Sequence, residues 1–114
     1  MTATGRAALG PDDLVLCAGT IPGASFVERL DAARVGGFAG LSLRVRDHAR
    51  ARADGLSDTD MRARLDDAGL AVAEIEVLTA WRPGVRAGRN APTADEVLAI
   101  AAGVGARSVC VVEG

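Results

Sequence analysis

The sequence lacks several features that mark whole classes of protein. No apolar run approaches the ~18 residues that a membrane-spanning helix needs. Residues 1–12 contain one arginine and no apolar stretch of the kind a secretory signal carries. Lysine is absent, so all 13 basic residues are arginine, and the net charge of −2 is not typical of a nucleic-acid-binding surface. We therefore expect a cytoplasmic protein without membrane or nucleic-acid partners, beginning with a flexible tail over residues 1–12.

Metal-ligating residues are also scarce. The chain has two cysteines, Cys17 and Cys110, and one histidine, His48. The cysteines lie in separate apolar segments without paired spacing, so we interpret both as reduced core residues and predict no zinc site. Residues 19–23 contain no G-x-G-x-x-G phosphate fingerprint. Metal ligands are therefore not predicted within this chain.

What the sequence does contain is a strand–helix unit that recurs over one small domain, residues 13–114. Three helix starts share an N-cap residue followed three positions later by an acid. They are Ser25 with Glu28, Ser57 with Asp60, and Thr93 with Glu96. Four apolar runs alternate with these helices and predict strands at residues 14–18, 41–45, 70–78 and 107–112. Residues 46–54 predict a charged loop.

This alternation predicts a parallel α/β sheet of order βαβαβαβ, because parallel strands need helical crossovers. Two architectures use that order: an open doubly wound sheet and a (β/α)8 barrel. In the second and third strands, polar residues alternate with apolar ones. The polar set is Ser42, Arg44, Arg46, Glu74 and Glu76, and the apolar set is Leu41, Leu43, Val45, Ala73, Ile75 and Val77. A barrel mouth accommodates such charges, whereas covering helices would bury them at a cost. Strands with one solvated face are the alternative.

Four strands and three helices amount to half of a (β/α)8 barrel. The first and fourth strands then have unpaired edges, which favour association. We expect the N-terminal half of a longer protein, or a half-barrel that associates with a second copy. A small open doubly wound sheet is the alternative fold.

Four segments carry a resemblance to a known family. They are residues 16–21 (LCAGTI), 30–43 (LDAARVGGFAGLSL), 64–72 (RLDDAGLAV) and 99–109 (AIAAGVGARSV). In this order they resemble the N-terminal half of the sugar phosphate isomerase/epimerase family, the xylose isomerase-like TIM barrels, over roughly residues 14–114. The resemblance implies a divalent metal (Mn, Mg, Co or Zn), a sugar or polyol substrate, and proton transfer next to a carbonyl. The family's metal ligands come from later strands, so the resemblance assigns no catalytic residue here.

Five residues are candidates for contacting a substrate. His48 follows the second strand and can bind a hydroxyl, or be solvated. Glu76, near the end of the third strand, can bind a hydroxyl, or pair with Arg44. Trp81 can stack on a sugar ring or anchor a loop, and Glu113 can face the site or be an end charge. Arg44 can attract a phosphate or be solvated, as can three further arginines, Arg46, Arg50 and Arg52.

Two other function classes stay open. A non-catalytic half-barrel that self-associates would form a stable dimer without metal-dependent activity. An endonuclease IV-like metal nuclease uses the same barrel with several histidines at strand ends, and this chain has one histidine and a negative net charge.

Overall fold

The computed structural model describes residues 8–79 and 91–112. Its four strands form one parallel sheet in the order β1-β2-β3-β4. The elements are β1 (Val15–Leu16), the 3-10 turn η1 (Ala18–Thr20), α1 (Phe26–Val35), β2 (Gly40–Arg44), α2 (Val45–Ala53), α3 (Asp58–Ala68), β3 (Ala71–Leu78), α4 (Ala94–Val104) and β4 (Ser108–Val111). The predicted order of strands and crossover helices is confirmed, with one helix more than expected.

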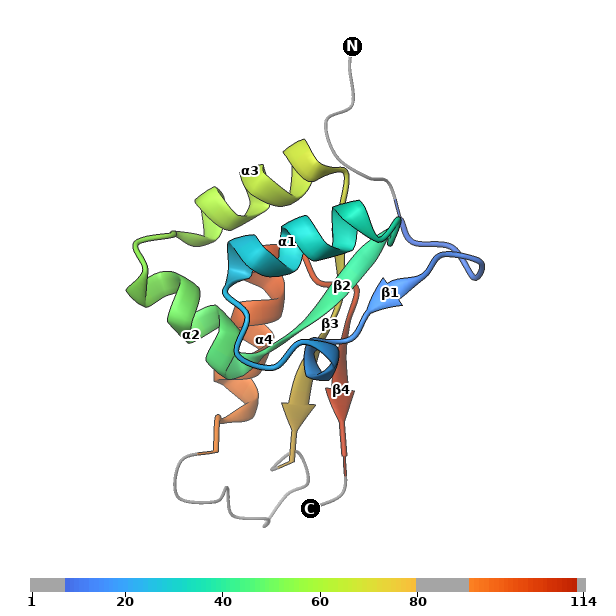
Figure 1. Cartoon of the computed structure of the whole chain (residues 1–114). Helices are drawn as coiled ribbons and strands as arrows, with labels where there is room; N and C mark the ends of the chain where they lie inside the picture. Colours follow the sequence, from blue (N-terminus) through green and yellow to red (C-terminus); the bar gives the residue numbers. More distant parts are fainter. Residues whose placement is uncertain (1–7, 80–90, 113–114) are drawn as a thin grey trace.

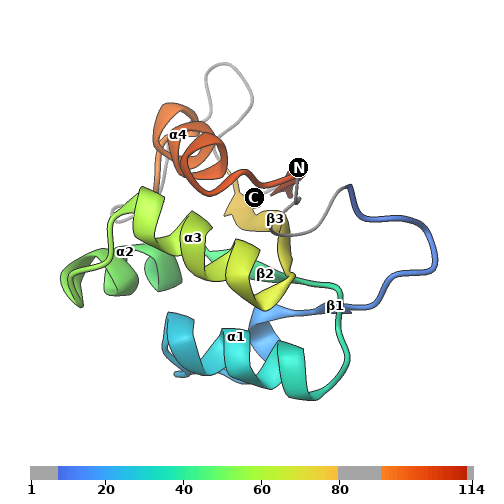
Figure 2. The same ribbon diagram turned by 90° about the horizontal axis from the view of Figure 1, so that it is seen from above.

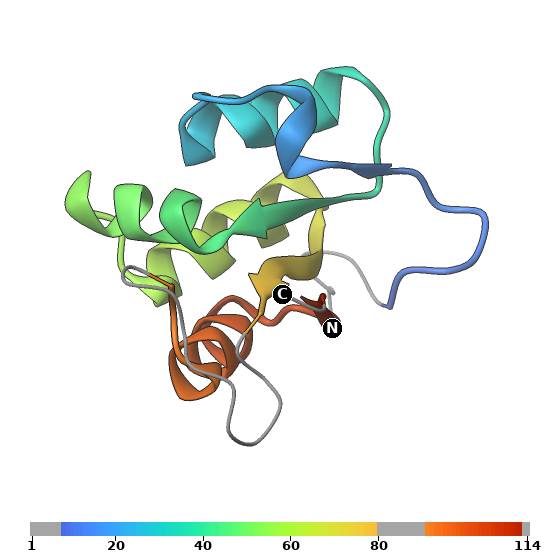
Figure 3. The ribbon, with the colours of Figure 1, turned by 90° about the horizontal axis from the view of Figure 1, so that it is seen from below.

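The helices lie on one side of the sheet, and the other side is open (Figures 1 and 2). Strand order follows chain order, and the sheet does not close on itself. A doubly wound sheet carries helices on both faces, so the one-sided helix layer is that of a half-barrel. The view from below shows the same separation of the strands from the helix layer (Figure 3).

The helix starts follow the sequence signals. The Ser25 Oγ accepts a hydrogen bond from the Glu28 backbone N–H, and the Glu28 carboxylate accepts one from the Ser25 N–H in return. Ser57 begins α3 in the same reciprocal way with Asp60. These bonds satisfy backbone donors that a helix N-terminus leaves without partners.

The core lies between the sheet and its helices. Its centre is formed by Leu43 and Ile75, which are Cα partners on neighbouring strands. Both side chains are fully buried. The helices contribute Phe26, Leu30, Met61, Leu65, Val97 and Val104, each at most 6% exposed. No helix in the described part of the chain is long and apolar enough to cross a membrane.

The predicted charged loop over residues 46–54 is wrong, because those residues form most of α2. Arginine and alanine, which dominate this segment, are strong helix formers. Asp47 starts the helix by accepting the Arg44 backbone N–H at 2.9 Å. Within residues 46–54 the buried apolar residue is Ala51, which is 1% exposed. A single small residue does not form an apolar stripe, so the sequence pattern did not indicate a helix here.

The predicted alternation along the third strand is also wrong at its ends. Two register shifts interrupt the pairing of β3 with its neighbours. As a result Val72 and Leu78 belong to the core cluster, whereas Val77 is 40% exposed. Cys17 is likewise exposed rather than in the core, and both cysteines are free thiols. Residues 1–7 lie outside the described residues, so the tail over residues 1–12 stays a prediction.

Candidate functional site

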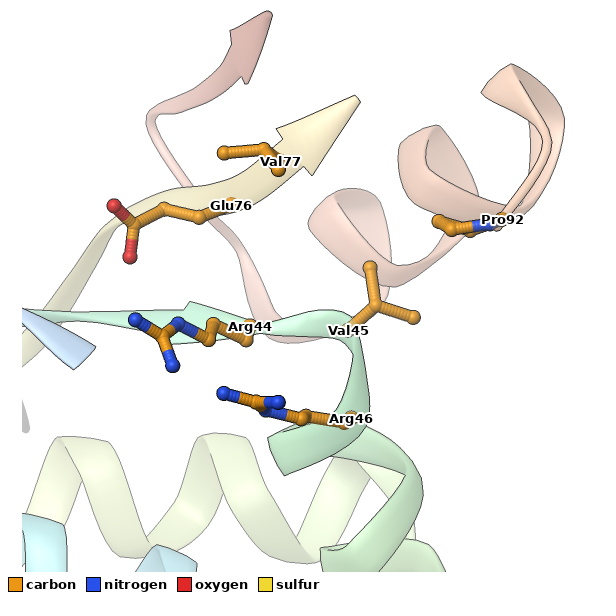
Figure 4. Close-up of a pocket in the computed structure, with 6 residues that line it drawn as sticks. All are labelled: Arg44, Val45, Arg46, Glu76, Val77 and Pro92. Carbon is orange, nitrogen blue, oxygen red and sulfur yellow. The ribbon is translucent and has the colours of Figure 1, made fainter. Parts of the chain in front are cut away.

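The site candidate lies at the carboxyl ends of β2 and β3, where the first turn of α2 and the segment before α4 also border it. Arg44 is the last residue of β2, and its Cα partner on β3 is Glu76. Both side chains line a hollow of about 620 Å³ (Figure 4). The lining residues are Arg44, Val45, Arg46, Glu76, Val77 and Pro92. The hollow therefore combines two cationic groups, one carboxylate and an apolar wall.

Ser42 holds the carboxylate in place from the neighbouring strand. Its hydroxyl donates a hydrogen bond to Glu76 Oε2 at 3.2 Å and accepts one from the Ala18 backbone N–H at 2.9 Å. Ser42 is buried, at 2% exposure, so its hydroxyl has few other partners. Ser42 thus connects three elements that are separated in the sequence, η1, β2 and β3.

A buried ion pair holds the segments around the hollow. Arg29, 3% exposed, donates from Nη2 to Asp47 Oδ1 at 3.1 Å and from Nη1 to the Ala18 carbonyl at 2.9 Å. Its Nε donates to the Ala24 carbonyl at 3.1 Å. One guanidinium thus binds the β1–α1 connection and the first turn of α2 together, which places the end of β2 between them.

Arg44 and Arg46 have free guanidinium groups. Within residues 8–79 and 91–112, neither side chain forms an ion pair or a hydrogen bond, and Glu76 does not pair with Arg44. The Arg44 guanidinium lies over Gly19, where an added Cβ would meet Nη2 at 2.8 Å. A residue without a side chain at position 19 therefore leaves room for Arg44.

His48 does not face this hollow. Its Nε2 lies 2.7 Å from Asp58 Oδ1 at the start of α3, and Arg52 Nη1 lies 3.8 Å from the same oxygen. His48 therefore connects α2 to α3 in the helix layer. Trp81 and Glu113 lie outside the described residues. Of the five candidates, the structure brings together Arg44 and Glu76.

Cys110 adds a thiol to the same open face. Partial burial raises the pKa of this thiol, and the carboxylates of Glu74 and Glu76 raise it further. The thiolate is disfavoured because it would add a negative charge beside two others.

The described residues do not form a metal site. No three His, Cys, Asp or Glu side chains come together in the part of the chain that the structure describes. Both oxygens of Asp47 are engaged, whereas Ser42 takes one oxygen of Glu76 and leaves the other. A divalent metal at the hollow would therefore need further ligands beside Glu76.

Sequence reasoning missed three residues that position the site: Arg29, Ser42 and Asp47. Asp47 had a local signal, since it stands three residues after a strand end, in the place of a helix-capping acid. Ser42 had a weaker one, as a small polar residue within an apolar strand. Arg29 had none, because its three acceptors come from other segments of the chain.

Comparison with known proteins supports the fold. No family model and no curated protein matches the chain. A xylose isomerase domain-containing protein from Salmonella typhimurium LT2 superposes with a TM-score of 0.70 at 18% identity, over 95% of this chain and 39% of that one. A xylose isomerase domain protein from Alicyclobacillus acidocaldarius subsp. acidocaldarius gives 0.59 at 23% identity, over 85% and 35%. The chain has a xylose isomerase-like half-barrel fold, as the resemblance predicted, and spans less than half of either neighbour's length.

Proposed function

We propose that this chain is the N-terminal part of a divalent-metal-dependent isomerase or epimerase, which acts in the cytoplasm on a sugar or related polyol by proton transfer next to a carbonyl. The observation that carries the proposal is the placement of Arg44 and Glu76 on neighbouring strands, at their carboxyl ends and on the open face. In (β/α)8 barrels the chemistry is built at this end of the strands. The neighbours' fold adds support.

Arg44 and Glu76 can form complementary hydrogen bonds with a polyhydroxy ligand. The Arg44 guanidinium donates hydrogen bonds to carbonyl or hydroxyl oxygens, and the Glu76 carboxylate accepts them from hydroxyl groups. Ser42 already occupies one oxygen of Glu76, which leaves the other for a ligand. The metal of the proposed enzyme would take its ligands from residues outside the described part of the chain.

Exchange of carbon-bound hydrogen with solvent tests the proposed reaction without knowledge of its direction. The chain, and any longer polypeptide that carries it, is incubated in D2O with aldoses, ketoses and their phosphates, each with Mn, Mg, Co or Zn. Proton NMR follows the C–H next to the carbonyl. We expect metal-dependent deuterium incorporation, lowered about 100-fold or more by Glu76→Gln, as loss of an acid–base or oxyanion contact does. Asp67→Asn, an exposed change on α3, is the matched control. Exchange unaffected by Glu76→Gln would contradict the role of this face.

Self-association of the half-barrel is a second candidate, favoured by apolar side chains at both sheet edges. Leu14, next to β1, is 66% exposed, and Val111 of β4 is 50% exposed. An edge strand presents unpaired backbone groups to a partner strand. Light scattering after size exclusion measures the mass: a folded dimer without metal-dependent activity supports a structural module, and a folded monomer contradicts it.

A further inference from the structure

Val77 is an apolar residue that the fold turns away from the core. After the buried Ile75, strict alternation would send Val77 into the helix layer and Leu78 to the open face. The pairing of β3 with β4 shifts register between Ile75 and Leu78, and the observed placement is the reverse. Leu78 is buried in the core cluster, whereas Val77 is 40% exposed. Irregularities of this kind re-aim side chains and are frequent beside active sites.

The exposed valine lines the hollow together with two further apolar residues. Val45 is the first residue of α2, and Pro92 lies just before the N-cap of α4. We call Val45, Val77 and Pro92 the apolar wall. Figure 4 shows the polar ends of Arg44 and Glu76 on one side of the view, and Val45 and Pro92 on the other. The hollow is therefore amphipathic, with hydrogen-bonding groups at one end and the apolar wall at the other.

An amphipathic hollow favours a ligand with the same division. At the polar end, the Arg44 guanidinium donates and the free oxygen of Glu76 accepts, so hydroxyl groups find partners there. A hydroxyl group set against the apolar wall gives up hydrogen bonds to water and finds no side-chain partner in return. A methyl group in the same place gains from leaving water. A ligand that carries hydroxyl groups throughout fits only one end of the hollow.

We propose that the hollow binds a polyol that carries an apolar group, a methyl or larger, next to its hydroxylated carbons, and that Val77 selects this group. The polyol part rests on the proposed function. The preference for an apolar group rests on the apolar wall alone. Val77 is the specificity-determining residue because its side chain is exposed at the hollow, whereas Val45 also packs against the core.

Three pairs of probes, each differing by one hydroxyl group, test the apolar wall without knowledge of the natural ligand. They are L-rhamnose with L-mannose, L-fucose with L-galactose, and 1,2-propanediol with glycerol. NMR titration of the chain, and of any longer polypeptide that carries it, measures the affinities. In the pairs that bind, we expect the methyl-bearing member to bind about three- to tenfold more tightly. We also expect nuclear Overhauser effects between its methyl protons and valine methyl groups, and their absence for all three methyl-bearing probes would overturn the proposal.

Variants of Val77 assign the preference to this side chain. Val77→Thr has nearly the same shape and exchanges one methyl group for a hydroxyl group, so it should abolish the preference. Val77→Ala stays apolar but is smaller, and it should weaken the methyl-bearing probes about threefold. Val111→Thr is the matched control, because Val111 is a strand valine with 50% exposure that does not line the hollow. It should retain the preference, and equal effects of Val77→Thr and Val111→Thr would overturn the role of Val77.

Two outcomes separate this proposal from the proposed reaction. A methyl preference that depends on Val77, without deuterium exchange on any sugar, upholds the apolar wall as a selective site and contradicts the isomerase. Deuterium exchange on sugars, with equal affinities within every probe pair, upholds the reaction and overturns the inference. A preference that persists in Val77→Thr would assign the apolar contact to another part of the molecule and also overturn it.

Discussion

The two faces of β2 differ at the carboxyl end of the strand. Leu41 and Leu43 point into the helix layer and are at most 1% exposed. Arg44, the next residue, lines the open hollow with a guanidinium that no described acceptor engages. Leu43 and Arg44 are adjacent in the chain, so strand alternation alone sends one side chain into the core and the next into the site.

This difference separates the groups that contribute to stability from those that remain available for binding. Groups on the helix side are satisfied by the protein, including the buried charge of Arg29. On the open side Ser42 is also satisfied, whereas the guanidinium groups of Arg44 and Arg46 retain hydrogen-bonding capacity for a ligand. Substitutions of groups that the protein satisfies should therefore change stability, and those of Arg44 and Arg46 should change binding.

Two arginines give the largest expected contrast. Arg29→Ala leaves Asp47 buried without its counter-charge and removes bonds to two carbonyls. We expect it to lower the free energy of unfolding by about 3–5 kcal/mol. Arg46→Ala removes an exposed side chain at the hollow that no described group engages, and it should change the free energy of unfolding by less than about 0.5 kcal/mol. Urea unfolding followed by circular dichroism measures both. Similar losses of unfolding free energy in Arg29→Ala and Arg46→Ala would mean that stability does not depend on Arg29 more than on Arg46.

Neighbouring residues of β2 give the next contrast. Leu43→Ala removes a fully buried side chain beside Ile75 and leaves a cavity. We expect a loss of about 2–5 kcal/mol. Arg44→Ala should cost less than about 0.5 kcal/mol by the same measurement. If Arg44→Ala destabilises as much as Leu43→Ala, the guanidinium has a structural role over Gly19 rather than a free one.

Two serine substitutions compare two positions on the open face of the sheet. Ser42→Ala leaves the buried Ala18 N–H without an acceptor and frees Glu76, and we expect a loss of about 1–3 kcal/mol. Ser108, exposed on β4, donates to the Ala73 carbonyl at 3.1 Å, and Ser108→Ala should cost about 0.5–1.5 kcal/mol. Thermal and urea unfolding measure the difference. If Ser108→Ala cost more stability than Ser42→Ala, Ser42 would not be the residue that holds the Glu76 carboxylate in place.

Most of the fold could be predicted from local patterns. The helices that begin after Ser25 and Ser57 follow capping signals that depend on four consecutive residues, and the strands follow apolar runs. The α2 helix was missed because its stability comes from Asp47 and Ala51 meeting residues of other segments. The register shifts of β3 were missed for the same reason, since the partner strands set them.

The site could be predicted only in part. Glu76 was a candidate because it lies near the end of the third predicted strand, and Arg44 was one of four arginines that can attract a phosphate. The structure makes these two residues Cα partners on neighbouring strands. His48 was a candidate by its place after β2, but a helix begins there instead and carries its ring to Asp58. The contacts of Arg29 span 5 to 18 positions in the sequence, which no local pattern records.

The two cysteines give the smallest and most local test of the open face. Cys17 is exposed, whereas burial and the carboxylates of Glu74 and Glu76 raise the pKa of Cys110. At a pH below that pKa the thiolate fraction of Cys110 is reduced, so iodoacetamide should alkylate Cys17 faster, as mass spectrometry of peptides can measure. Glu76→Gln removes one negative charge, lowers the pKa of Cys110 and should speed its alkylation while leaving Cys17 unchanged. If the rate at Cys110 does not respond, Glu76 does not act on this face through its charge, and its part in a shared site with Arg44 loses its electrostatic basis.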